Sequence, residues 1–175
     1  MTPEQSIEWI KGHPEVGSIR TVATDLNGVL RGKRLPSAHM QKVLSGALKL
    51  PLSTMGVDIW GRDAIDSGQV LETGDRDGTC VPTERGLLPI DWLEQPTALL
   101  PVWMYTDDNK PYLADPRHAL DAIVQRYKAI GLTPVCATEL EFYLYDPVNA
   151  PIDAPLAPDT GRRLRSNAMY SIDNL

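Results

Sequence analysis

The chain has 175 residues, and its 17 Lys and Arg against 23 Asp and Glu give a formal net charge of -6. Hydrophobic residues make up 42% and charged residues 23%, which excludes wholesale disorder. The acidic balance argues against a nucleic-acid partner, which would need a basic face. The length corresponds to about one and a half domains.

Neither a membrane segment nor a secretion signal is readable in the sequence. No apolar run reaches the roughly 18 residues of a membrane span, and the N-terminus has no basic region followed by an apolar stretch. Cys80 and Cys136 lie far apart and form no metal-type pair. These features indicate a reducing, cytoplasmic setting without a membrane partner, and a disulfide between the two cysteines stays open as the alternative.

The first predicted element is a short helix. Thr2 and Gln5 have the spacing of a capping box, and His13-Pro14 ends the helix because a residue before proline avoids helical geometry. Ile7 and Ile10 are expected to face the core.

A hairpin and a second helix follow. Residues 18–26 and 29–35 read as strands, with Asn27-Gly28 between them as a tight two-residue turn. Ser37 is expected to cap a helix that carries apolar residues at helical spacing, namely Met40, Val43, Leu44 and Ala47.

The middle of the chain is cut by Gly, Pro and Asp, and its strands are harder to assign. A long surface loop is expected over residues 53–67, with Trp60 as a packing anchor. Residues 97–105 read as a strand, and residues 106–109 read as the turn that follows it. Three shorter segments are candidate strands, namely residues 50–52, 69–71 and 85–89.

The clearest predicted helix begins at Asp115-Pro116. Asp115 is a good cap, proline suits the first helical position, and Gly131 ends the helix. An apolar stripe runs along it at positions Leu120, Ile123, Val124 and Tyr127. A strand over residues 133–145 is expected to follow directly.

Two glutamates on this last predicted strand are the main candidates for chemistry. Side chains alternate between the faces of a strand, so Glu139 and Glu141 would share a face about 7 Å apart. Like charges this close repel each other, and one or two hard divalent cations would remove that penalty. The alternative is a half-exposed strand with two solvated glutamates, which is common on exposed sheet faces.

Five segments in chain order resemble motifs of the glutamine synthetase superfamily, and within it the γ-glutamylputrescine synthetases and other glutamate–amine ligases. The resemblance covers the chain from about Ile19 to its last residue. The segments are DLNGVLRGKRLP (25–36), MGVDIWG (55–61), DRDGTCVP (75–82), TELEFYLYD (138–146) and YSIDNL (170–175).

This resemblance implies an α+β fold with two parts. A β-grasp domain would cover residues 14–112, and the incomplete start of a catalytic domain would cover residues 113–175. The resemblance also implies that Glu139 and Glu141 ligate Mg²⁺ or Mn²⁺. ATP would be the co-substrate, and its γ-phosphoryl group would pass to the side chain of glutamate.

Asp58 loosely matches the loop aspartate with which the family binds ammonia or a primary amine at a neighbouring subunit. This match implies a homo-oligomer. The alternative for Asp58 is an exposed loop aspartate without a role in binding. The family's other ligands would lie beyond this chain, so the chain alone is expected to be inactive. A different class of function is a non-catalytic β-grasp interaction module that associates with full-length subunits.

Overall fold

The computed structural model describes residues 1–72, 74–142, 144–146, 153–156, 161 and 163. The chain divides into two compact units, Met1–Pro134 and Val135–Leu175, and each is considered by itself. The motif at residues 170–175 lies outside the described residues. No helix within the described part is long and apolar enough to cross a membrane.

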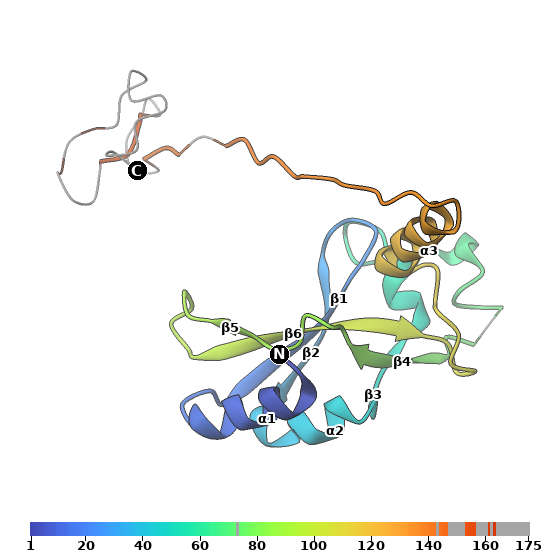
Figure 1. Cartoon of the computed structure of the whole chain (residues 1–175), viewed down its shortest axis with the longest axis horizontal. Helices are drawn as coiled ribbons and strands as arrows, with labels where there is room; N and C mark the ends of the chain where they lie inside the picture. The colour runs from blue at the N-terminus through green and yellow to red at the C-terminus, as the bar shows by residue number, and fades with distance from the viewer. Residues whose placement is uncertain (73, 143, 147–152, 157–160, 162, 164–175) are drawn as a thin grey trace. The chain divides into compact units, whose positions relative to one another are not determined.

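The first unit is built on a mixed six-stranded sheet, which confirms the expected α+β class (Figure 1). The strand order is β2-β1-β6-β4-β3, and β5 also pairs with β6. The β1–β6 pair is parallel, and the other pairs are antiparallel. The strands are β1 (Ser18–Thr24), β2 (Leu30–Pro36), β3 (Leu48–Pro51), β4 (Asp77–Pro82), β5 (Leu88–Ile90) and β6 (Thr97–Tyr105).

The core gathers around β6, with buried residues of β1, β3 and β4 beside it. Leu100, Val102 and Met104 of β6 are fully buried, which explains why this strand reads as a nearly continuous apolar run. Helices α1 (Pro3–Gly12) and α2 (Met40–Leu44) lie side by side near one face (Figure 1). The remaining helices are α3 (Pro116–Ala129) and the short 3₁₀ turns η1 (Ser37–His39), η2 (Leu52–Gly56) and η3 (Ile65–Ser67).

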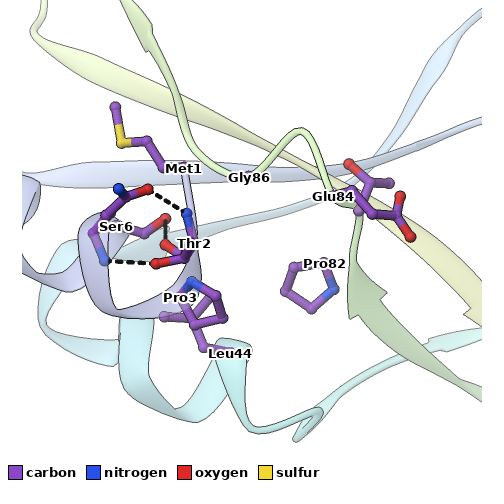
Figure 2. Close-up of a pocket in the computed structure, with 10 residues that line it drawn as sticks. Met1, Thr2, Pro3, Ser6, Leu44, Pro82, Glu84 and Gly86 are labelled. Atoms are coloured by element: carbon purple, nitrogen blue, oxygen red, sulfur yellow. Dashed lines mark hydrogen bonds between the residues drawn. The ribbon is translucent and has the colours of Figure 1, made fainter.

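The start of α1 has the predicted capping box. The Gln5 N–H donates to Thr2 Oγ1 at 3.2 Å, and the Thr2 N–H donates to Gln5 Oε1 at 2.8 Å (Figure 2). The inward face differs from the expectation, because Ser6 is the buried residue while Ile7 and Ile10 are half-buried.

The β1–β2 hairpin is confirmed, but its turn is longer than predicted. The Asp25 N–H donates to the Val29 carbonyl and the Gly28 N–H donates to the Asp25 carbonyl, both at 3.0 Å. Gly28 has a φ of 77°. Three residues therefore form the loop, with glycine in the left-handed position that such loops need.

Several local expectations for the first unit are wrong. Ser37 does not cap a helix, because Pro36 occupies the cap position of η1 without a side-chain hydrogen bond. Residues 69–71 form no strand, whereas β4 was missed because Gly78 and Pro82 interrupt its apolar pattern. Strands β3 and β5 form near the predicted segments with shifted bounds.

Helix α3 forms as predicted, from its Asp115 cap to Gly131, whose φ is 79°. Its apolar stripe is not buried in the described structure: the exposed fractions are 65% for Leu120, 45% for Ile123 and 45% for Tyr127. The predicted helix is therefore correct, but the described residues bury little of this stripe.

The predicted strand over residues 133–145 is wrong for the described residues of that segment (133–142, 144 and 145). These described residues have neither helix nor strand, and Figure 1 draws them as plain coil after α3. Val135, Leu140 and Phe142 are at least 76% exposed. An alternating sequence forms a strand only when a neighbouring strand satisfies its backbone groups, and no described residue pairs with this segment.

Candidate functional site

Asp25 fixes the tip of the β1–β2 hairpin from inside the protein. The residue is 1% exposed, and its side chain accepts hydrogen bonds from the N–H groups of Asn27 (2.8 Å) and Val29 (2.9 Å) and from Arg31 Nε (2.8 Å). Burial by itself raises the pKa of Asp25, but the bonds from Arg31, Val29 and Asn27 together hold it below its ordinary value. The carboxylate is therefore ionised near neutral pH, and both of its oxygens accept hydrogen bonds.

The hairpin tip is joined to the loop that carries Asp58. Asn27 Nδ2 donates to the Val57 carbonyl at 2.9 Å. A Cβ built on Gly61 would lie 3.2 Å from Arg31 Nη1, so the guanidinium lies against this glycine. The two segments are more than 25 residues apart in sequence, and these contacts hold them as one structural feature.

Asp58 shapes its own loop with one carboxylate oxygen. Asp58 Oδ1 accepts the N–H groups of Trp60 at 2.8 Å and Arg62 at 2.9 Å. The Asp58 N–H donates to the Arg62 carbonyl at 2.9 Å, and Val57 pairs with Asp63 in an isolated bridge. Asp58 is exposed, so the loop presents its carboxylate at the surface in a defined turn.

Apolar side chains of the hairpin tip and this loop are exposed. Trp60 is 77% exposed, so its predicted role as a packing anchor is wrong within this chain. The exposed apolar members are Leu26, Val29, Leu30, Ile59 and Trp60.

Glu139 and Glu141 lie in the second unit, in the segment without helix or strand, and both are exposed. The described residues contain no group of three or more His, Cys, Asp or Glu side chains that could hold a metal ion. Two carboxylates of this spacing fit hard cations chemically, since Mg²⁺ and Mn²⁺ prefer oxygen ligands. They would supply part of a coordination shell.

The structure thus groups Asp58 with hairpin residues to which the sequence analysis assigned no site role. Asp25 and Arg31 hold the hairpin tip, and Asn27 ties it to the Asp58 loop. The available signal was an Asp three residues before the glycine of a turn, since an aspartate there accepts the turn's N–H groups. The burial of Asp25 had no counterpart in the sequence pattern.

A separate hollow of about 470 Å³ lies at the start of α1 (Figure 2). Its lining comes from the first six residues except Glu4, from Leu44 at the end of α2, and from the end of β4 and the turn that follows it (Pro82, Thr83, Glu84 and Gly86). Neither Asp58 nor either of the two glutamates lines it, so it does not belong to the predicted site.

The chain is similar to a curated ligase over nearly its whole length. It is 34% identical over 170 residues to γ-glutamylputrescine synthetase PuuA of Escherichia coli K12, which covers 95% of this chain and 36% of that protein. It is 28% identical over 149 residues to glutamine synthetase of Thermus thermophilus, covering 82% of this chain and 31% of that protein. The chain therefore spans about a third of the length of these relatives.

Solved structures show the same fold in their matching part. A crystal structure of a glutamine synthase homolog matches 66% of this chain and 27% of its own, with a TM-score of 0.57 and 22% identity. The GmaS/ADP complex matches 74% of this chain and 26% of its own, with a TM-score of 0.55 and 18% identity. No protein-family model matches the chain.

The ordered motifs, the mixed sheet and the two sets of relatives all indicate the same superfamily. The chain belongs to the glutamine synthetase superfamily and corresponds to the N-terminal region of its relatives.

Proposed function

We propose that this chain is the N-terminal part of an ATP-dependent ligase that joins glutamate to a primary amine or to ammonia. The product would be a γ-glutamyl amide, formed by way of γ-glutamyl phosphate. The observation that carries this proposal is the 34% identity over 170 residues to a γ-glutamylputrescine synthetase. An amine is favoured over ammonia because this relative's identity exceeds that of the glutamine synthetases.

Glu139 and Glu141 are the proposed metal ligands. When bound there, Mg²⁺ or Mn²⁺ would neutralise the phosphate oxygens of ATP. The exposed carboxylates of both residues leave their oxygens available for such ions. The further ligands would come from residues other than those described, because the described part has no third donor grouped with them.

Asp58 is the proposed amine-binding residue. Its loop has a defined turn and is tied to the hairpin tip by Asn27, so the carboxylate is held in place before any ligand arrives. An exposed carboxylate attracts a protonated amine and can accept its proton.

The same proposal covers the wider organisation. Residues 14–112 would be the β-grasp domain and residues 113–175 the start of the catalytic domain. The protein would act as a cytoplasmic homo-oligomer in which Asp58 serves a neighbouring subunit. Both cysteines are free thiols, which is consistent with a reducing setting.

A non-catalytic interaction module is the second candidate. The exposed apolar stripe of α3 favours it, because such a face needs a cover. Mixing the chain with a full-length relative and measuring mixed oligomers by light scattering tests this candidate. A chain that stays monomeric with no affinity for the relative would contradict it.

The ligase proposal can be tested in a chimera. This chain would replace the matching N-terminal region of the E. coli relative, and ATP turnover would be measured with glutamate and a panel of amines. We expect Asp58→Asn to raise the KM for the amine about tenfold or more, since it removes the charge that attracts the ammonium. Asp66→Asn, a substitution of another exposed aspartate, in η3, is the control and should leave the KM unchanged.

A further inference from the structure

A second hollow, of about 410 Å³, lies between the end of α1 and the β5–β6 connection. One side consists of residues from Trp9 to Val16, and the other of residues from Pro89 to Thr97. Its volume is within the range of small-molecule pockets. Asp58, Glu139 and Glu141 do not line it, so it is independent of the proposed ligase site.

One wall of the hollow is a stacked aromatic pair. The rings of Trp9 and His13 have centroids 4.0 Å apart and planes 18° apart. His13 Nδ1 lies 2.7 Å from the Trp9 carbonyl oxygen. Because a carbonyl oxygen only accepts, Nδ1 carries the hydrogen, and in that tautomer of the imidazole Nε2 is an acceptor.

The charged residues that line the hollow are all acidic. Glu15 and Asp91 contribute carboxylates, and no Lys or Arg is among the lining residues. Within the described part of the chain, neither carboxylate forms an ion pair. The Thr97 hydroxyl already donates its hydrogen to the Ser18 carbonyl at 2.8 Å.

The polar side chains of the hollow thus accept hydrogen bonds and carry negative charge, while its apolar surface comes from Trp9, Ile90 and Leu93. A ligand that matches must be a cation with N–H donors and a short apolar body. An indole also attracts cations through its π face. We propose that this hollow binds a small, free primary alkylammonium ion, with its nitrogen toward Glu15, Asp91 and His13 and its alkyl chain against Trp9.

The test is a titration of the 175-residue chain followed by ¹H–¹⁵N NMR. n-Butylammonium chloride should shift the Trp9 indole N–H and the amide signals of His13 and Asp91 in a saturable way. n-Butanol has the same alkyl body without charge and should cause no saturable shift. Tetramethylammonium chloride has the charge without N–H donors, and we expect it to bind about tenfold more weakly.

Variants that replace the two carboxylates by neutral amides test whether their negative charge binds the ligand. The double variant Glu15→Gln/Asp91→Asn should weaken n-butylammonium binding about tenfold, because each exposed carboxylate contributes a few-fold. Glu94→Gln, on the same connection but outside the lining, is the matched control and should bind like the unmodified chain. All three substitutions are at exposed positions, so the fold should be kept.

Three results would overturn the proposal. The first is equal binding of n-butanol, and the second is unchanged affinity in the double variant. The third is tighter binding of N-acetyl-lysine methylamide than of n-butylammonium, which would assign the hollow to a peptide lysine. Loss of the ligase activity in Asp58→Asn would leave this test unaffected, since Asp58 does not line the hollow.

Discussion

Asp25 lies in the hairpin tip and Asp58 in the loop joined to it, and their side chains have different roles. Asp25 is buried and uses both carboxylate oxygens to hold the hairpin tip. Asp58 is exposed and uses one oxygen to shape a turn. The sequence indicated Asp58 through family resemblance alone, whereas the burial of Asp25 depends on packing that no local pattern encodes.

Replacing Asp25 by Asn should lower the free energy of unfolding at pH 7 by about 2–4 kcal/mol. The variant loses the charge that pairs with Arg31 and leaves that guanidinium, 24% exposed, without its partner. Urea unfolding followed by circular dichroism measures the loss. Asp108→Asn, which breaks an exposed ion pair with Lys110, should change stability much less.

The same variant should change how stability depends on pH. The pKa of Asp25 is lowered in the folded protein, so its contribution is complete above the unfolded value of about 3.9 and is lost as the pH falls through the folded value. The unmodified chain should therefore lose more stability than Asp25→Asn as the pH falls below about 4. Parallel pH profiles for the two proteins would contradict this account.

At the scale of elements, the termini of helices were easier to predict than the partners of strands. The capping box of α1 and the Asp115-Pro116 start of α3 are local signals, and both were confirmed. Residues 97–105 also formed the predicted strand, because β1, β4 and β5 all pair with it. Residues 133–145 have an equally good strand pattern but no described partner, and a pattern cannot supply one.

Asp115 connects α3 to β6 and should therefore be more important than an ordinary cap. Its side chain is fully buried and accepts both the Arg117 N–H and the Met104 N–H, each at 3.0 Å. Asp115→Ala should lower the free energy of unfolding by about 2–4 kcal/mol, since it removes a cap and leaves a buried strand N–H unsatisfied.

Thr2→Ala is the matched comparison for Asp115→Ala, because Thr2 caps α1 at the surface. Thr2→Ala should lower the free energy of unfolding by about 1 kcal/mol, measured by urea unfolding for both variants. A loss for Asp115→Ala no larger than that for Thr2→Ala would show that the bond to Met104 adds nothing.

At the scale of the whole molecule, the buried core lies entirely in the first unit. Its members run from Val16 to Tyr112, and the second unit adds none among the described residues. The length of about one and a half domains predicted an uneven division, and the family resemblance implies a domain boundary at residues 112–113. The two compact units of the chain are Met1–Pro134 and Val135–Leu175, and α3 belongs to the first unit, where Asp115 joins it to β6. The boundary between β-grasp and catalytic domains remains a prediction.

A chain ending at Pro134 should therefore unfold at the same urea midpoint as the whole chain. The hydrophobic core and the six strands are all retained, so the free energy of unfolding should agree within about 1 kcal/mol. A clearly lower midpoint for the shorter chain would mean that the second unit stabilises the first.

The metal assignment of Glu139 and Glu141 is the central claim, and ATP turnover in the chimera with the E. coli relative tests it most directly. Glu139→Gln and Glu141→Gln keep the shape of each side chain and remove its charge, while Glu94→Gln is the control. The account predicts that each glutamine at 139 or 141 lowers Mg²⁺-dependent turnover at least about a hundredfold, and that the control stays fully active. An active chimera whose turnover is unchanged by both substitutions would contradict the account.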